Sequence, residues 1–206
     1  MPYSNDHKMQ TRARIVEEAR MLFNIHGFNG VTIEMVMAEA GLTRGDFYNH
    51  FKNKEALFSA AVASFLMGRG AQWRDEAGID VTCLNPEMAR HMIDSYLSDE
   101  HLGDLENQCP MIALPSDVAR SSADVQQAYQ QLLSAMVGLF EKSLAVEGKA
   151  PRQEALSLAA LCVGGMVLAR TLPGSEIAEE VRAAAHATAR QMASDPVNPV
   201  REASAG

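Results

Sequence analysis

Aromatic residues and cysteines are scarce in this sequence of 206 residues. Aromatic residues make up 6% of it, and the three cysteines have neither the CxxC spacing of a zinc site nor the even number of a disulfide framework. The longest uncharged apolar stretch, residues 155–169, is shorter than the ~20 residues that cross a bilayer, and no apolar run follows the first residues. We therefore expect a soluble protein of the reducing cytoplasm, with neither a signal peptide nor a membrane partner.

Basic residues are also outnumbered. The chain has 18 Lys and Arg against 26 Asp and Glu, a net charge of −8. Taken whole, this charge argues against nucleic-acid binding, which depends on Lys and Arg. The distribution changes that conclusion. Residues 1–60 carry as many basic as acidic residues, so the whole deficit lies in residues 61–206, and residues 1–14 and 43–54 are each net positive.

The composition favours helices. Ala, Leu and Met together outnumber Val, Ile and Thr by more than two to one. Hydrophobic spacing and helix caps predict an all-α fold of about nine helices. The expected helices are 9–26, 33–40, 44–50, one from 54, one from 86, one from 116 or 122 to 147, 152–172 and 175–193, with a short or irregular segment at 110–115.

The first 51 residues fit a helix-turn-helix. Gly27 ends the first helix and Thr32 caps the second. Gly41 permits a sharp bend, and Thr43 caps a recognition helix at about 43–50. The residues at the start of this last helix are Thr43, Arg44, Gly45, Tyr48 and Asn49.

These residue types suit contact with DNA. Gly45 allows a close approach of the backbone, Tyr48 can reach a phosphate, and Arg44 can contact a guanine edge or a phosphate. Lys54, at the start of the next helix, adds a charge to free backbone N–H groups, which is typical of an anion site.

A longer run of residues resembles the TetR/AcrR family of one-component transcriptional regulators. It covers about residues 10–60, a quarter of the chain, and consists of Ala19, Phe23, Gly27-Phe28, Thr32-Ile33, Val36, Ala40-Gly41-Leu42-Thr43, Gly45, Phe47-Tyr48, His50-Phe51, Lys54-Glu55 and Leu57. The resemblance implies phosphate contacts for Thr32, Tyr48, His50 and Lys54, and base or backbone contacts for Thr43, Arg44 and Gly45.

Two residues depart from the family pattern. Met37 stands where the family usually has Ala, at a close approach between helices. Asp46 stands where a small polar residue is common. Its carboxylate could accept a hydrogen bond from a cytosine amino group, cap the helix locally, or repel phosphate.

The resemblance implies a helix-turn-helix DNA-binding domain at 1–55 and a larger ligand-binding and dimerisation domain at 56–194, followed by a frayed tail at 195–206. Methionine-rich walls adapt to varied apolar ligands, so a small apolar or amphipathic effector is expected. The same residue types also build cores. Candidate ligand contacts are Phe65, Met67, Trp73, Met88, Met92, Tyr96, Met111, Tyr129, Leu133, Met136 and Met166.

Helices 152–172 and 175–193 are rich in Ala and Gly, and the first is too apolar to face water on a monomer. Such small residues permit a close approach of helices. We expect this pair to form the interface of a two-fold homodimer as a four-helix bundle.

Other chemistry has little support in the sequence. Cys109, in an apolar segment, is either a small buried residue or a redox sensor. His91 lies near Glu87 and Asp94 at helical spacing, but without a second His or Cys no metal site is expected. No dinucleotide-binding motif, GxSxG or HExxH occurs, so we expect neither a cofactor nor an enzyme.

The sequence therefore predicts a ligand-responsive transcriptional regulator, nucleoid-associated in the cytoplasm. As a repressor, a homodimer would bind a pseudo-palindromic double-stranded operator and be released by a small molecule. The alternative is a helical small-molecule-binding protein or enzyme without DNA binding, which would have no use for the first sixty residues. A regulator that activates, or that needs no ligand, is a third possibility.

Overall fold

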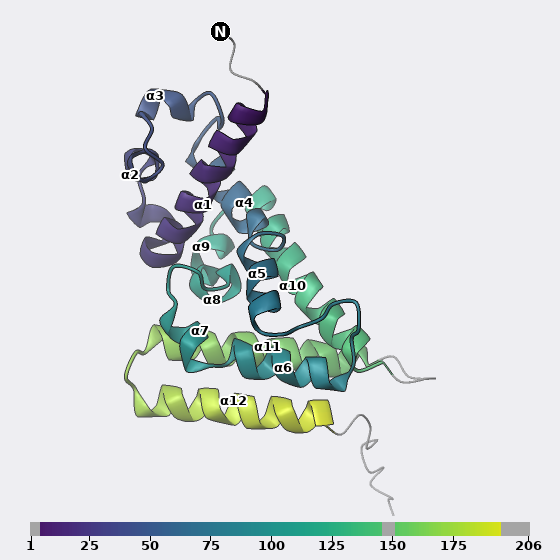
Figure 1. Cartoon of the computed structure of the whole chain (residues 1–206). Helices are drawn as coiled ribbons and strands as arrows, with labels where there is room; N and C mark the ends of the chain where they lie inside the picture. The colour runs from purple at the N-terminus through teal and green to yellow at the C-terminus, as the bar shows by residue number, and fades with distance from the viewer. Residues whose placement is uncertain (1–4, 146–150, 195–206) are drawn as a thin grey trace, which may run out of the picture. The chain divides into compact units, whose positions relative to one another are not determined.

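The computed structural model describes residues 5–145 and 151–194, and these ranges hold helices and no strands, as Figure 1 shows. The predicted all-α class is confirmed. The helices are α1 (Asn5–Gly30), α2 (Ile33–Glu39), α3 (Arg44–Phe47), α4 (Lys54–Ser64), α5 (Arg69–Glu76), α6 (Pro86–Tyr96), α7 (Asp99–Gly103), α8 (Pro110–Ala113), α9 (Pro115–Ala119), α10 (Ala123–Ser143), α11 (Arg152–Thr171) and α12 (Glu176–Ser194).

Twelve helices in the described residues exceed the nine or so that were expected, because several are short. The long helix expected from residue 54 is divided into α4 and α5. Glycine permits this break: a Cβ on Gly70 would lie 2.7 Å from the carbonyl oxygen of Phe65, and a Cβ on Gly68 would lie 2.8 Å from that of Ser64. Pro110 and Pro115 each stand at the start of a short helix, where a missing N–H costs nothing.

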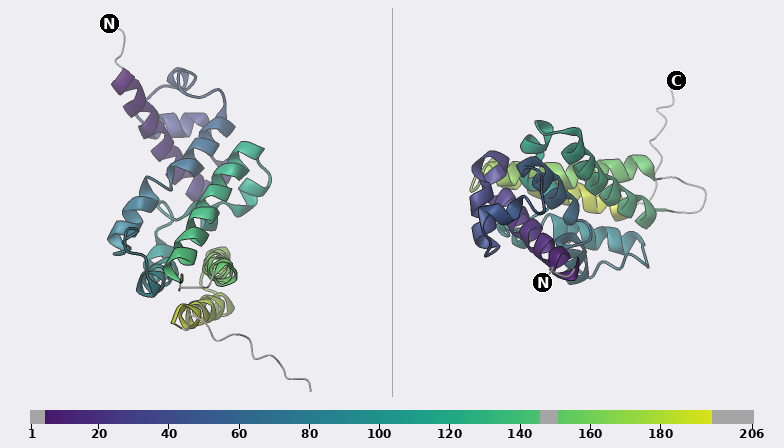
Figure 2. Two further views of the ribbon diagram at one scale, coloured as in Figure 1. Left: turned by 90° about the vertical axis from the view of Figure 1, so that its right-hand side faces the viewer. Right: turned by 90° about the horizontal axis from the view of Figure 1, so that it is seen from above.

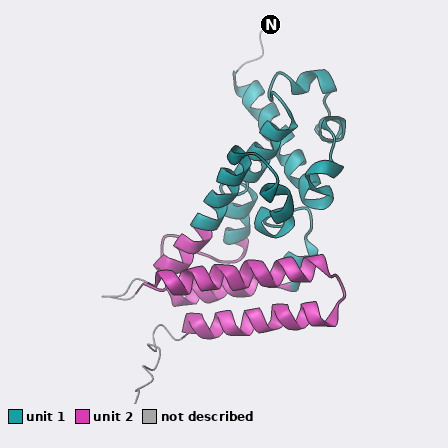
Figure 3. Ribbon diagram, turned by 180° about the vertical axis from the view of Figure 1, so that it is seen from behind, with its two compact units in different colours: residues 1–75, 99–134 teal, residues 76–98, 135–206 magenta. Residues whose placement is uncertain are grey.

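The described residues divide into two compact units, coloured separately in Figure 3. Unit 1 comprises residues 1–75 and 99–134, and unit 2 comprises residues 76–98 and 135–206. Neither unit ends at residue 55, where the sequence places the domain boundary. Unit 1 contains the helix-turn-helix together with residues 56–75 and 99–134. The functional division into 1–55 and 56–194 stays a prediction, and the tail at 195–206 lies outside the described residues.

A buried arginine explains why residues 99–134 belong to unit 1. Arg20 of α1 is 1% exposed. Its Nη1 donates to the carbonyl oxygen of Glu106 at 2.9 Å, and its Nη2 donates to Oδ1 of Asn107 at 2.9 Å and to Oε1 of Glu17 at 2.6 Å. One turn further along α1, the amide of Asn24 donates to the carbonyl oxygens of Glu106 and Gln108. Four hydrogen bonds thus join α1 to residues 106–108.

Helix α4 is bonded to the same part of the chain. Oε1 of Glu55 accepts from the backbone N–H of Ser122 at 2.9 Å, and the Ser59 hydroxyl donates to the carbonyl oxygen of Asp124 at 3.3 Å. Between α1 and α4, the rings of Phe23 and Phe58 lie edge to face with centroids 4.8 Å apart. The core of unit 1 is therefore continuous from the helix-turn-helix into the start of α10.

In unit 2, α11 and α12 lie side by side (Figures 1 and 2), as the two small-residue helices were expected to do. The close approach requires Gly165, because a Cβ there would lie 3.0 Å from Cβ of Ala185 and 3.2 Å from Cδ2 of Leu97. Arg182 of α12 donates to the carbonyl oxygen of Leu97 at 2.7 Å. Among the described helices, α11 alone is long and apolar enough to cross a membrane, but one face of it is buried within unit 2.

Replacing Arg20 by Met should lower the free energy of unfolding by about 2 kcal/mol, because the hydrogen bonds lost belong to a buried charged group. Arg120 is the matched control: its side chain is 66% exposed and pairs only with Asp117 of the same helical turn. Arg120→Met should change stability by less than about 0.5 kcal/mol. Urea unfolding followed by circular dichroism measures both, and equal losses would contradict the role given to Arg20.

Candidate nucleic-acid interface

The turn between α2 and α3 has the geometry that the sequence predicts. Thr32 is extended, and its hydroxyl oxygen accepts from the backbone N–H of Met35 at 3.2 Å, which caps α2. Gly41 has a φ of +65°, a conformation that other residues adopt only with strain. Gly27 likewise has a φ of 69° and interrupts α1 where the sequence places its end. Met37, which stands where the family usually has Ala, is accommodated in the core and is only 1% exposed.

Asp46 caps α3. Its Oδ2 accepts from the backbone N–H of Thr43 at 3.0 Å and from the Thr43 hydroxyl at 2.7 Å. These hydrogen bonds hold the pKa of Asp46 below its ordinary value of 3.8. The sequence left three roles open for Asp46: a hydrogen bond with cytosine, local capping, and repulsion of phosphate. The geometry corresponds to local capping. It fixes the entry to a helix of four residues, which has little stability of its own.

The predicted DNA contacts around this turn face solvent. Thr32, Thr43, Arg44, Gly45, Tyr48 and Asn49 are all exposed. The exposed fraction of Tyr48 is 58%, with its ring edge-on to that of Phe47. Nη1 of Arg44 lies 2.7 Å from Oε1 of Glu34 in α2, so this guanidinium has an exchangeable partner on the same surface.

Lys54 differs from the expectation of a free charge at the start of α4. Its Nζ donates to the carbonyl oxygens of Phe28 and Val31 at 2.8 and 2.9 Å, and it lies 4.2 Å from the centre of the Phe28 ring. Burial lowers the pKa of Lys54, opposed by Asp117. In this structure the ammonium holds the end of α1 and the residue that follows it in place through these two hydrogen bonds. A contact of Lys54 with phosphate stays a prediction.

His50 lies beside residues of α1 that sequence reasoning did not assign to the site. A recess of about 490 Å³ in unit 1 is lined by His7, Lys8, Thr11, Arg14, Leu42, Asp46, Asn49 and His50. We call it the α1–α3 recess. Burial first, and then Lys8 and Arg12, lower the pKa of His50. The sequence signals were the net positive charge of residues 1–14 and the helical spacing of positions 7, 11 and 14.

The candidate ligand contacts are divided between the two units. Eight are buried or half-buried as core residues are: Phe65, Trp73, Met88, Met92, Tyr96, Met111, Met136 and Met166, to which half-buried Tyr129 adds a hydroxyl that donates to the carbonyl oxygen of Met111. Met67 and Leu133 differ from these residues, since they are 82% and 40% exposed, and all the expected ligand contacts stay predictions. Met67 lies in the turn between α4 and α5, where the divided helix turns it outward.

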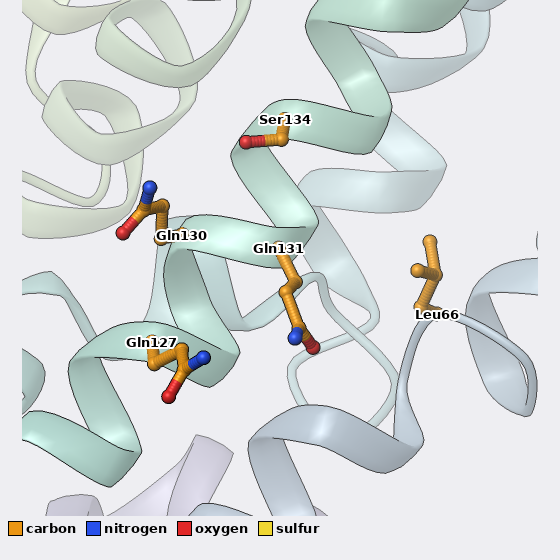
Figure 4. A pocket seen from close by; sticks show the side chains of 5 residues that line it. All are labelled: Leu66, Gln127, Gln130, Gln131 and Ser134. Atoms are coloured by element: carbon orange, nitrogen blue, oxygen red, sulfur yellow. The ribbon is translucent and has the colours of Figure 1, made fainter.

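None of these candidates lines the recess shown in Figure 4. This recess of about 410 Å³, next to α10, is lined by Leu66, Gln127, Gln130, Gln131 and Ser134. Four of these five side chains end in an amide or a hydroxyl group, none of them charged.

Cys109 is buried at the start of α8. Its backbone N–H donates to Nε2 of His101 at 3.5 Å, so the fold brings to it an imidazole eight residues distant in sequence. Burial, together with Cys109, raises the pKa of Tyr129 to about 12. Burial also raises the pKa of the Cys162 thiol to about 12, which makes that thiol unreactive. A sensor role for Cys109 stays a prediction.

Known proteins match the helix-turn-helix in sequence. The family model described as bacterial regulatory proteins, tetR family, matches residues 15–61. Over 58 residues the chain is 38% identical to the transposon Tn10 TetC protein of Escherichia coli, and over 57 residues it is 39% identical to the HTH-type transcriptional repressor AcnR of Corynebacterium diphtheriae. Each alignment covers 28% of this chain, and the chain spans 29% and 30% of the length of these relatives.

The rest of the chain is similar to known proteins in fold. A TetR-family transcriptional regulator from Streptomyces coelicolor matches with a TM-score of 0.67 at 20% identity, over 92% of this chain and 97% of that one. At this identity the likeness shows the fold alone. The capped α2, the Gly41 turn and α3 define a helix-turn-helix protein. The family match at residues 15–61 shows that this helix-turn-helix is of the kind found in the tetR family of bacterial regulatory proteins.

Replacing Asp46 by Ala should speed amide hydrogen exchange of Thr43 and of α3 several-fold at pH 7, because both capping bonds lose their acceptor. Asp46→Asn keeps an amide oxygen in place and should keep most of the protection. Because the folded-state pKa of Asp46 is lowered, the protection is present above pH 3.8 and is lost as the pH falls below it. Exchange followed by NMR tests this, and wild-type rates in Asp46→Ala would exclude the cap.

Proposed function

We propose that the protein is a transcriptional repressor that binds a pseudo-palindromic operator as a homodimer and is released by a small molecule. The observation that carries the DNA-binding part is the α2–turn–α3 geometry. Two capped helices meet at a glycine with a positive φ, and this segment exposes Arg44, Gly45, Tyr48 and Asn49 together. These residues supply base-edge and phosphate contacts, and the short α3 is narrow enough to enter a major groove.

The names of the sequence relatives support repression. AcnR of Corynebacterium diphtheriae is a transcriptional repressor, and its similarity to this chain lies in the part that carries the helix-turn-helix. The charge distribution is consistent with this function. The acidic remainder of the chain repels DNA, so that binding depends on a docked helix-turn-helix rather than on general attraction.

The proposed dimer interface consists of the outer faces of α11 and α12. Leu156, Leu168 and Leu172 and, on α12, Ile177 are between 42% and 60% exposed. Along α12, the exposed residues Ala183, Ala184 and Ala187 leave the backbone accessible to a close partner. An apolar face of this size needs a partner in water, and a second copy of the same pair completes a four-helix bundle.

Release by an effector would use the interior of the part of the chain after the helix-turn-helix. The buried Met and aromatic side chains of the expected ligand-binding part can repack around varied apolar molecules. Such a ligand acts only if it binds the DNA-free state of the dimer more tightly than the DNA-bound state.

DNA binding is tested by selecting duplexes from a random library with the full chain and measuring affinity by fluorescence anisotropy. Gly45→Ala should weaken binding to the selected duplex about tenfold, since a methyl group would separate the α3 backbone from DNA. The fold tolerates it, because a Cβ on Gly45 comes no closer than 3.7 Å to the atoms around it. Gly103→Ala, also in open space, is the control. Failure to select any duplex would overturn the proposal.

Replacing Leu168 by Glu should raise the dimer dissociation constant at least tenfold, because the interface would bury an unpaired charge. Leu133 of α10 has a similar exposed fraction, 40% against 45%, and Leu133→Glu should leave the dimer intact. Sedimentation equilibrium measures both variants. A monomeric wild type, or equal effects of the two changes, would remove α11 from the interface.

A further inference from the structure

The α1–α3 recess combines donors from two parts of the chain. Helix α1 supplies the Lys8 ammonium, the Thr11 hydroxyl and the Arg14 guanidinium, and the segment after α3 supplies the Asn49 amide and His50. Lys8 and Arg14 are exposed, so their charges are available to a ligand. The recess thus offers five kinds of hydrogen-bond donor and at least two positive charges within about 490 Å³.

The recess has one acidic residue, Asp46, against the cations Lys8 and Arg14. Oδ2 of Asp46 already accepts two hydrogen bonds from Thr43, so this oxygen is turned toward the α3 cap. His50 has a buried Nδ1 without a hydrogen-bond partner among the described residues. His50 also lines the recess, and its ring donates from both nitrogens when it is protonated, which suits an anionic ligand.

We propose that the α1–α3 recess binds a backbone phosphate of the operator, through Lys8, Thr11 and Arg14 of α1 together with Asn49 and His50. This rests on the proposed function and extends the DNA contact to a helix outside the helix-turn-helix. Asn49 indicates why the ligand is a phosphate of DNA. It lines the recess and also belongs to the exposed recognition segment, so a phosphate bound here would be part of the same DNA strand that α3 is proposed to contact. Multiple donors on one phosphate set the register of the protein on the duplex.

Proton uptake follows from the charges that face His50. Burial, and then Lys8 and Arg12 of α1, lower its pKa, and Asp46 of α3 raises it. Arg12 itself lies over the Phe51 ring, 4.6 Å from its centre. Arg14 and His7 also line the recess. A bound phosphate adds negative charge opposite these cations and favours protonated His50. Affinity for the operator should therefore rise as the pH falls from 8 to 6.

The test uses the full chain and the selected duplex. Lys8→Ala/Arg14→Ala should lower the slope of log affinity against log salt by about one for the phosphate lost. Lys142→Ala/Arg152→Ala, an equal charge change on exposed residues of unit 2, should leave the slope unchanged. His50→Gln should flatten the dependence of affinity on pH, whereas His7→Gln should not abolish it. Unchanged thermal unfolding confirms that each variant is folded.

The outcomes separate the two proposals. A wild type that binds no duplex overturns both the function and this contact. A wild type that binds, with the same salt slope in Lys8→Ala/Arg14→Ala, overturns the recess contact alone. NMR of the His50 ring during titration with inorganic phosphate is the remaining arm: a shift with phosphate alone, combined with an unchanged slope on duplex, assigns the recess to free phosphate instead of DNA.

Discussion

The buried guanidinium of Arg20 is the interaction on which the architecture of unit 1 depends. A charge that is 1% exposed requires several acceptors, and these come from Glu17 on its own helix and from Glu106 and Asn107, more than eighty residues further along the chain. Helix α1 therefore cannot move independently of residues 106–108 without leaving polar groups unpaired in the interior. In a regulator, a movement of residues 106–108 would also move α1, the helix against which α2 packs. The coupling is a property of shared hydrogen bonds and needs no separate signalling element.

The other end of unit 1 relies on small local contacts. Helix α3 has four residues and stands between a glycine turn and the turn at residues 48–50, so it has little cooperative stability. Its order comes from the Asp46 cap and from Phe47, which is fully buried beneath it. On a helix proposed to enter the DNA groove, an acidic residue costs electrostatic attraction. Here the carboxylate keeps the helix folded, and the positive charge is supplied by neighbours: Arg44 on the helix itself and Lys8 and Arg14 of α1.

Much of the helix-turn-helix was predictable because its signals are local. Thr32, Gly41 and Gly27 act through their own backbone angles and caps, which the residue type decides. The division of the chain was not predictable, since Arg20 in the sequence is one more polar residue between apolar ones. One of its distant acceptors is a backbone carbonyl group, which any residue provides, and the other is the side chain of Asn107, which no sequence pattern links to Arg20. The inward turn of Lys54 was missed for the same reason. The exposure of Met67 was not predictable either, because the break between α4 and α5 depends on how closely Gly68 and Gly70 approach carbonyl oxygens.

Three polar side chains of the proposed interface already have partners within the protein. Arg44 pairs with Glu34, Lys54 donates to two carbonyl groups, and the Thr43 hydroxyl donates to Asp46. A phosphate must compete with each of these partners, so weak, undirected contact with DNA gains little. Only a duplex that brings several phosphates and base edges into place at once can exchange them all with a net gain. Together with the acidic charge outside residues 1–60, this favours binding that depends on the fit of the duplex rather than on attraction to any polyanion.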